Sequence, residues 1–385
     1  MTIAAHIIFW GSAIWIGSVY VFYPALLILI GACRRPSQPV PVADDALPSV
    51  LMLIPAYNEE HVIARKIENA LSLDYPSNKL EMLVVSDCST DRTDEIAASF
   101  AEKGVRFLRN TEQKGKIRTL SELGAEASAD ILLITDANAI YAPDALRMLV
   151  APFADPNVGI VNGNRRLIPS ASMAGEGEGI YWRYETMLKK AESDVFSNAF
   201  ITGAMTAIRR ELFLPLPGYL EFDHVLPLHV VNCGYRVVFE ERACFEEDTA
   251  PHASAEWRVR VRNAVRGFTM VLEMHRFLRI ARHPGFVLHV WLRKVLRWLI
   301  GVPALLALLS NIVLATVHPF YIFLLFGQLA FYAAACAGWL LERIGRARAL
   351  LAIPFYFCLV NAASLVGLWH AIRGQRLAVW KTGRA

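Results

Sequence analysis

The fold is decided by residues 50–60, which read VLMLIPAYNEE. In this stretch a continuous apolar run passes directly into an aromatic ring, an amide and two carboxylates. Further short apolar runs follow at Leu80–Ser86, Val105–Leu108 and Ile131–Thr135. Short apolar runs bounded by polar residues predict buried strands. We therefore expect Val50–Ala56 to be the first in a set of neighbouring strands.

Segments with helical periodicity lie between these strands. They span Glu59–Leu71, Asp91–Glu102, Lys116–Ala127 and Pro143–Phe153. Strands that alternate with helices in this way predict a largely parallel sheet with helices on both faces.

A second half of the domain mixes shorter strands with helices. The predicted strands are Val158–Asn162, Ala204–Ile208 and Arg236–Glu240, and the predicted helices are Glu176–Ser193 and Asp223–Asn232. Together the two halves predict one α/β domain with a mixed sheet, covering residues 36–255.

Apolar residues are concentrated at the two ends of the chain. The composition is 55% hydrophobic with a mean hydropathy of +0.36. From Ile7 to Cys33 there is no charged residue, which exceeds the roughly 20 apolar residues that cross a bilayer. The basic pair Arg34-Arg35 follows, so residues 1–35 predict a membrane helix that leads the chain into the cytoplasm.

The C-terminal third predicts interfacial helices and then further membrane segments. Residues 256–297 interleave arginines with aromatic residues, as in an amphipathic helix at a membrane surface. Residues 298–385 contain three apolar segments, at Trp298–Val317, Phe320–Leu341 and Ala349–Ile372.

The charge pattern does not decide on which side of the membrane the C-terminal tail lies. The loop 342–348 is basic and is expected to be cytoplasmic. Three crossings would place the basic tail outside, so either the last segment is re-entrant or the charge rule fails there. The basic residues of the tail are Arg373, Arg376, Lys381 and Arg384.

Charge and cysteine content exclude two classes of function. The formal net charge is only +4 and the arginines cluster beside apolar segments, which favours membrane anchors over a nucleic-acid surface. The six cysteines show no CxxC pair and no spacing to histidine that would hold zinc. We expect no nucleic-acid partner and reduced, structural thiols.

Polar side chains follow the predicted strands at the edge where open α/β sheets bind ligands. Asp87 follows one strand, where it can contact a ligand or cap the next helix. Asp136 and Asn138 follow another, where they can share a divalent cation such as Mg²⁺ or form an ordinary turn. Lys114 and Lys116 precede a helix and suit a phosphate, although solvated lysines are an almost equal alternative.

Asp223 opens a predicted helix in the second half of the domain. Its carboxylate can act as a general base toward an acceptor hydroxyl, or it can cap the helix. His224, His229 and His252 are read as structural, with His252 as an alternative metal ligand.

Taken together, these motifs resemble the membrane-bound family 2 glycosyltransferases, which include hyaluronan, chitin and cellulose synthases. The resemblance extends from the first membrane helix to the tail. It rests on residues 54–60 (IPAYNEE), 86–91 (SDCSTD), 114–116 (KGK), 135–138 (TDAN) and 203–210 (GAMTAIRR).

The resemblance implies a GT-A fold and assigns roles to particular residues. Asp223 corresponds to the catalytic base. The residues implied around the nucleotide sugar are Ala56, Tyr57, Glu59, Asp87, Lys116, Asp136 and Arg262. Those implied on the acceptor side are Gly203, Phe222 and Arg266. Asp136 and Asn138 correspond to the metal-binding DxD, with an amide in place of the second acid, and Phe222 stands where the family has the first member of an acidic pair.

The resemblance also implies an activity: inverting transfer from a UDP-sugar to a growing glycan at the cytoplasmic face of an inner membrane, with Mg²⁺ or Mn²⁺. Residues 259–263 (VRVRN) match the family's QxxRW but keep only Arg262. One alternative is therefore a single addition to a lipid-linked acceptor. Another is a non-catalytic subunit that binds nucleotide sugar. A transporter is disfavoured, because no charged group lies at mid-depth in the apolar segments.

Overall fold

The computed structural model describes residues 2–33, 43–168, 172–249, 252–344, 346 and 348–375. The basic pair Arg34-Arg35, the linker at 36–42 and the tail from Arg376 onward lie outside the described residues, so the predictions about them stay predictions.

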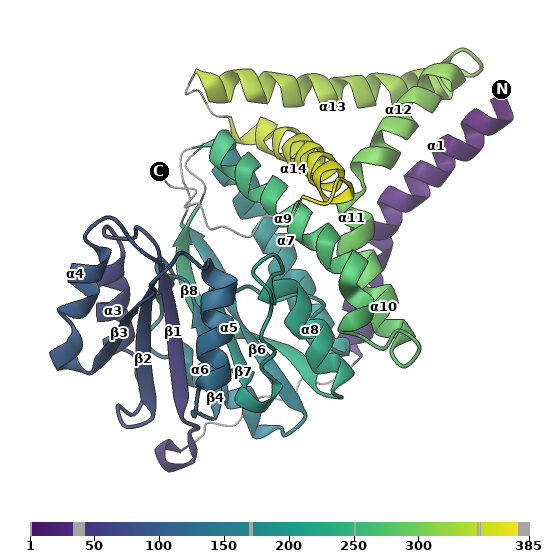
Figure 1. Ribbon diagram of the computed structural model, residues 1–385. Helices are drawn as coiled ribbons and strands as arrows, with labels where there is room; N and C mark the ends of the chain where they lie inside the picture. Colours follow the sequence, from purple (N-terminus) through teal and green to yellow (C-terminus); the bar gives the residue numbers. More distant parts are fainter. Residues whose placement is uncertain are drawn as a thin grey trace.

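An eight-stranded sheet forms the centre of the domain, in the order β3-β2-β1-β4-β7-β6-β8-β5 (Figure 1). Its first half contains β1 (Val50–Ala56), β2 (Leu80–Ser86), β3 (Val105–Arg109) and β4 (Ile131–Thr135), all mutually parallel. The prediction of these four strands is confirmed, but the expected burial of β3 was wrong, because β3 lies at the edge of the sheet and only Val105 is buried.

The second half makes the sheet mixed. Strand β7 (Met205–Arg209) runs antiparallel to β4 and to β6 (Val158–Ile168), and β8 (Arg236–Asp248) runs parallel to β6. The predictions for β6 and β8 were wrong in length, because both strands continue past a register shift between Gly163 and Asn164. The short strand β5 (Ile140–Tyr141), antiparallel to β8, was not predicted.

Helices cover both faces of the sheet, as predicted. Alternate residues of β1 point to opposite faces, so Met52 and Ile54 pack in one core and Leu51 and Leu53 in the other. The first core receives α3 (Ile63–Leu71), α4 (Thr93–Ala98) and α6 (Ala145–Val150); the second receives α5 (Lys116–Glu126) and α8 (Phe222–Asn232).

Helices α7 and α9 connect the sheet to the apolar part of the chain. Helix α7 spans Met173–Val195, and α9 spans Ala253–Glu273, so it begins three residues before the predicted boundary at 256. Helix α9 packs along α14 (Ala349–Ile372). Its arginines were expected at the lipid surface, but Arg260 pairs with Glu256 and Arg266 with Glu221.

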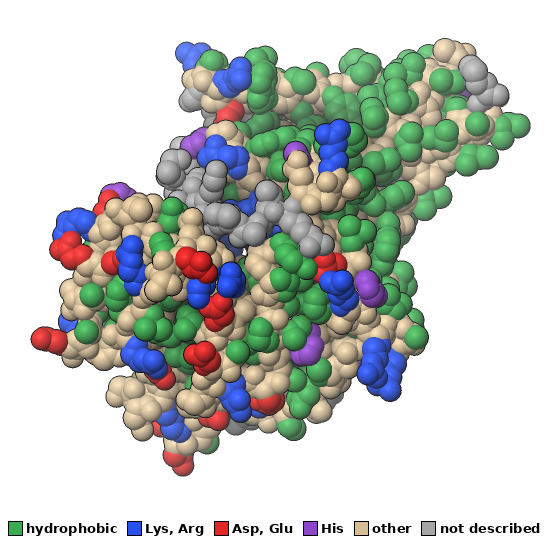
Figure 2. Space-filling view, viewed as in Figure 1, with side chains coloured by type: hydrophobic (Ala, Val, Ile, Leu, Met, Phe, Trp, Pro, Cys, Tyr) green, Lys and Arg blue, Asp and Glu red, His purple; other side chains and the backbone are tan. Residues whose placement is uncertain are grey.

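Three described helices are long and apolar enough to cross a membrane: Thr2–Ala32, Pro319–Arg343 and Leu350–Ile372. The first combines α1 (Thr2–Gly17), a π-helical turn (Ser18–Phe22) and α2 (Tyr23–Ala32), and the second is α13. The predicted span at Trp298–Val317 is instead α12 (Gly301–Ala315), which joins Pro284–Trp298 at a 59° bend. Figure 2 shows apolar side chains covering this region, whereas charged ones gather over the sheet domain.

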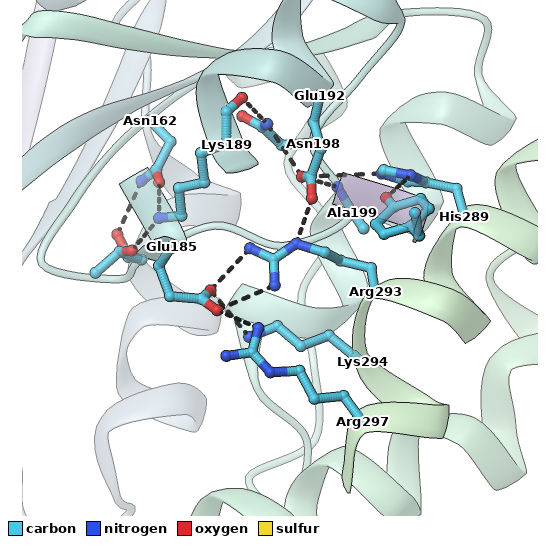
Figure 3. A network of polar contacts seen from close by, with 12 residues as sticks. Asn162, Glu185, Lys189, Glu192, Asn198, Ala199, His289, Arg293, Lys294 and Arg297 are labelled. Atoms are coloured by element: carbon cyan, nitrogen blue, oxygen red, sulfur yellow. Dashed lines mark hydrogen bonds and ion pairs between the residues drawn. The ribbon is translucent and has the colours of Figure 1, made fainter. Parts of the chain in front are cut away.

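A buried cluster of charges joins α7 to the bent helix pair (Figure 3). Helix α10 (Pro284–Val290), a π-helical turn (Trp291–Val295) and α11 (Leu296–Trp298) form the first arm of that pair. Arg293, only 2% exposed, donates to both carboxylate oxygens of Glu185 at 3.1 and 2.8 Å and also binds Glu192. Arg297 binds Glu185 as well. Because an unpaired buried charge is costly, this cluster fixes the apolar helices onto the sheet domain.

Candidate active site

A cavity of about 690 Å³ lies where the carboxyl ends of the strands meet α7, α9 and α14. Strands β1 and β4 are adjacent in the sheet, so their polar ends meet at one edge. Eight of the predicted site residues line this cavity: Glu59, Lys116, Asp136, Asn138, Gly203, Asp223, Arg262 and Arg266. Segments distant in the sequence therefore converge on one site.

Lys116 and Asp136 form an ion pair inside the cavity. Lys116 is the first residue of α5 and follows Gly115, whose φ of +81° favours glycine. Burial alone would raise the pKa of Asp136, but the Lys116 ammonium outweighs it and the pKa is lowered. Asp136 is therefore an anion at neutral pH, with Lys116 beside it to meet phosphate.

Asp87 lies behind the cavity wall and is only 1% exposed. Its two oxygens accept hydrogen bonds from the backbone N–H groups of Lys114 and Gly115, both at 2.8 Å, and from Asn110 Nδ2 at 2.8 Å. In this structure Asp87 fixes the loop that places Lys116. Asp87 was expected to lie in the cavity with the other acids, but it acts on the cavity only through that loop.

Three other predicted residues also lie outside the cavity wall. Ala56 is fully buried in the core, and Tyr57 is not among the lining residues. Phe222, 2% exposed, packs its ring 5.5 Å from that of Phe213. The acid on this turn is instead Glu221, which lines the cavity and pairs with Arg266. The sequence resemblance matched the family's acidic pair to Phe222 and Asp223, and Glu221 was not identified.

Strained turns carry the chain out of β1 and β2. Asn58 has φ of +53° and Cys88 has φ of +64°, in the left-handed region that side chains rarely adopt. Asn58 Oδ1 accepts a 2.8 Å hydrogen bond from the Thr90 backbone, which joins the two turns. Such strain is concentrated at functional sites, and here it lies beside Glu59 in the cavity wall.

Asn138 and Asp136 offer oxygen ligands for a divalent cation. Asn138 Nδ2 donates to Glu247 Oε1 at 2.7 Å, so the amide nitrogen is engaged, and within the described part of the chain no group donates to the amide oxygen. Among the described residues no three His, Cys, Asp or Glu side chains cluster as a metal site. Mg²⁺ at substrate sites is held by one or two carboxylates together with substrate phosphates, so this small donor set fits.

Asp223 faces the cavity from the first turn of α8. It contacts Gly203 closely: a Cβ atom added to Gly203 would lie 2.9 Å from Asp223 Oδ1 and 3.7 Å from Lys116 Nζ. Burial raises the pKa of Asp223, with Lys116 and the Gly203 backbone N–H opposing the effect. A carboxylate with a raised pKa in a cavity is suited to accept a proton.

Three nitrogen atoms in the cavity wall are buried without a hydrogen-bond partner among the described residues: Trp182 Nε1, His224 Nδ1 and Arg262 Nε. Buried polar atoms are normally paired, so orphaned ones at a cavity indicate a site that a polar ligand completes. The His224 ring also packs edge-on against Phe200 and Trp298. Its pKa is lowered by burial to about 3, so it is neutral.

The cavity continues from these polar groups to α14. One face of that helix lines it, at Ile353, Tyr356, Phe357, Val360, Asn361 and Ser364. At the rise of an α-helix this face is roughly 16 Å long. Trp298 and Tyr20 complete the wall. Its hydropathy predicts α14 only as a membrane segment, and this surface was not predicted.

Comparison with known proteins gives a consistent picture. The family model described as glycosyl transferase family 2 matches residues 52–214. The chain is 32% identical over 252 residues to the probable glycosyltransferase YdaM of Bacillus subtilis, covering 61% of this chain and 59% of that protein. It is 27% identical over 287 residues to poly-beta-1,6-N-acetyl-D-glucosamine synthase of Staphylococcus aureus, covering 72% and 68%.

A solved structure is similar in fold. The mannosyltransferase PcManGT of Pyrobaculum calidifontis superposes with a TM-score of 0.67 at 23% sequence identity, covering 94% of this chain and 97% of that one. The matched segment 52–214 holds Glu59, Lys116, Asp136 and Gly203, which all line the cavity. Residues 52–214 therefore match a family 2 glycosyltransferase domain, and the chain as a whole shares the fold of that mannosyltransferase.

Proposed function

We propose that this chain transfers a sugar from a nucleoside diphosphate donor to an acceptor hydroxyl, with inversion at the anomeric carbon. The observation that carries the proposal is that two aspartates with oppositely shifted pKa values line one cavity. Asp136 is held as an anion beside Lys116, whereas the pKa of Asp223 is raised. Carboxylates whose environments push their pKa values apart are suited to different roles in one reaction.

The reaction follows from these two environments. Asp223 takes the proton from the acceptor hydroxyl as its oxygen forms a bond to the anomeric carbon. The bond from that carbon to the diphosphate oxygen breaks on the opposite side, and the diphosphate leaves with the bonding electrons. Lys116 and Arg262 lie in the wall to stabilise the charge that develops on it. A single displacement of this kind inverts the configuration.

Asp136 and the amide oxygen of Asn138 are the residues that would hold Mg²⁺ or Mn²⁺ with the donor phosphates. When bound, the cation neutralises charge on the leaving diphosphate. The mannosyltransferase of similar fold was solved with GDP-Man and Mn²⁺. For this chain we propose a UDP-sugar, with Glu59 in the wall and Asp87 behind it on the nucleotide side.

The proposal also includes a location for the reaction, at the surface of a membrane. The candidate spans and the predicted charge bias support an inner-membrane protein whose catalytic domain is cytoplasmic. The chain spans 59% of the length of YdaM and 68% of that of the S. aureus synthase, so the activity of the whole protein remains part of this proposal. A growing glycan is the acceptor that the synthase relative suggests.

A lipid-linked acceptor is a second candidate, favoured by the α14 wall. The side-chain donors of Asn361 and Ser364 are satisfied by carbonyls of their own helix, at 2.8 Å each. Their neighbours Ile353, Phe357 and Val360 are apolar. Such a wall offers few partners to a hydroxyl-rich chain and suits a hydrocarbon chain.

One experiment tests the activity and separates the acceptors. The purified protein in native-lipid nanodiscs is supplied in turn with radiolabelled UDP-glucose, UDP-N-acetylglucosamine and GDP-mannose, with Mn²⁺. We expect nucleotide release from one donor and its loss in Asp223→Asn, with nucleotide binding retained. Label in organic solvent extracts indicates a lipid-linked product; label in a water-soluble polymer indicates a glycan. Release that is absent for every donor, or retained in Asp223→Asn, contradicts the proposal and favours a non-catalytic subunit or a different base.

A further inference from the structure

Two lysines are buried at the cavity: Lys66 of α3, which has no exposed surface and lies behind the wall, and Lys189 of α7, which is 4% exposed and lines the wall. Neither forms an ion pair within 4 Å among the described residues. Burial lowers the pKa of each to about 7. Carboxylates at longer range oppose this lowering, Asp136 and Glu247 for Lys66 and Glu185 and Asp223 for Lys189. Because a buried ammonium is costly without close partners, direct hydrogen bonds are needed to stabilise both groups.

Lys66 holds the turn that carries Asp136 and Asn138. Its Nζ donates to Thr135 Oγ1 at 3.0 Å, immediately before the turn, and to the carbonyl of Ala139 at 2.7 Å, immediately after it. The ammonium also lies 3.8 Å from the centre of the Tyr141 ring, a cation–π contact. The two ends of the turn are thereby clamped to one point.

Lys189 holds the turn that carries Gly203. Its Nζ donates to Thr202 Oγ1 at 2.6 Å and to Asn162 Oδ1 at 2.8 Å. Figure 3 shows Lys189 pointing toward Asn162 from α7. Asn162 Nδ2 in turn donates to the carbonyls of Thr202 and Met205, at 3.1 and 2.9 Å. Gly203 is thus held on both sides, where it contacts Asp223.

The two turns are joined by a third set of hydrogen bonds. Thr135 Oγ1, which accepts from Lys66, donates to the carbonyl of Ala204 at 3.0 Å. Tyr141 OH donates to the same carbonyl at 2.8 Å. A continuous polar chain therefore runs from Lys66 through Thr135 and the 202–205 turn to Lys189. Lysine has three N–H donors and no acceptor, so one group can bind two oxygens at once.

We propose that Lys66 and Lys189 are positioning residues, which hold the Asp136–Asn138 turn and the Thr202–Gly203 turn at a fixed separation. Asp136 and Asp223, which both line the cavity, then face one donor molecule. The inference rests on the proposed function, because it assigns the two lysines a role in that reaction without contact to the reacting atoms. The residues of the two turns that these lysines hold make the contacts with the donor instead.

The test compares kcat with KM, because a positioning defect lowers kcat while donor binding is largely kept. Lys66→Met and Lys189→Met remove the donors with little change in volume. We expect kcat for nucleotide release to fall by roughly 10- to 100-fold, the scale expected for a misplacement of up to about 1 Å. The KM for the donor that the wild type uses should change less than about threefold.

Matched variants of Thr135, which accepts the hydrogen bond from Lys66, isolate the effect of that bond. Thr135→Val removes the hydroxyl and keeps the shape, whereas Thr135→Ser keeps the hydroxyl. We expect Thr135→Val to lower kcat like Lys66→Met, Thr135→Ser to stay near wild type, and the double variant Lys66→Met/Thr135→Val to be no slower than the slower single variant. If the methionine variants melt below the assay temperature, the comparison of Thr135→Val with Thr135→Ser still tests the positioning role of Lys66.

Outcomes separate this inference from the proposed function. No nucleotide release by the wild type defeats the proposed function first. Wild-type turnover together with unchanged kcat in folded Lys66→Met and Thr135→Val defeats the positioning role. A raised KM at constant kcat does so too, because it assigns the lysines to donor binding. Additive losses in the double variant would show that Lys66 does not act through Thr135.

Discussion

Replacing Gly203 by alanine tests the geometry around the proposed base most directly. The added carbon would lie 2.9 Å from Asp223 Oδ1, inside the 3.4 Å at which ordinary contacts begin. The carboxylate must therefore retreat by about half an ångström. Since a misplacement of about 1 Å costs on the order of 100-fold in rate, we expect kcat to fall roughly 10-fold.

The assay measures nucleotide release at saturating donor and acceptor, together with the melting temperature. Gly179→Ala is the matched control, because nothing lies within 4 Å of the added carbon and Gly179 is in the interior of α7. That variant should keep wild-type kcat and gain up to about 1 kcal/mol of stability. Wild-type kcat in Gly203→Ala, or an equal loss in Gly179→Ala, refutes the placement of Asp223 as the base.

Three further predictions follow from the cavity and its supports. Removal of divalent cations with EDTA should abolish nucleotide release, and added Mn²⁺ should restore it; activity that survives chelation contradicts the role of Asp136. Asn138→Asp should lower activity, because the new carboxylate would face Glu247, which lies 2.7 Å from the present amide nitrogen. The second substitution Glu247→Gln should restore activity to that variant. A gain of activity in Asn138→Asp alone would contradict this reasoning. Glu185→Gln removes the carboxylate that faces Arg293, Arg297 and Lys294, although Arg293 keeps Glu192, and it should cost about 3–5 kcal/mol of unfolding free energy; thermal melting measures it, and an unchanged melting temperature would be inconsistent with the anchoring role of the cluster.

The first half of the sheet was predictable because β1 and β4 are continuous apolar runs that are buried throughout, and β2 is largely so. Strands β1, β2 and β4 match the predicted bounds to the residue. The far ends of β6 and β8 were not predictable, since they are charged and are held by pairs such as Arg165 with Glu247. No hydrophobic pattern marks such a strand.

Three acids of the site were predictable, whereas Glu221 and the supporting residues were not. Glu59, Asp136 and Asp223 were found because carboxylates at strand or helix ends are visible in the sequence. Lys189 was missed, because a lysine in a helical pattern is ordinarily solvated and its partners lie on other elements. Asp87 was placed in the cavity, whereas its partners are backbone N–H groups 27 and 28 residues away.

The raised pKa of Asp223 links catalysis to stability with a definite sign. Burial disfavours the carboxylate, so the folded protein binds this proton more tightly than the unfolded chain does. The stability that this group contributes is therefore present below the unfolded pKa and is lost as pH rises through the folded value. Catalysis needs the opposite form, so activity should fall as pH drops through that same raised pKa.

Asp223→Asn separates the two effects, because an amide does not titrate. At neutral pH the variant should be inactive yet melt at or above the temperature of the wild type, since the disfavoured charge is gone. As pH falls below the folded pKa, the wild type becomes protonated and any advantage of the variant should shrink. Melting curves across this range measure the difference directly. A variant that is less stable than the wild type at neutral pH, with the gap closing in acid, would mean that the fold favours the Asp223 charge.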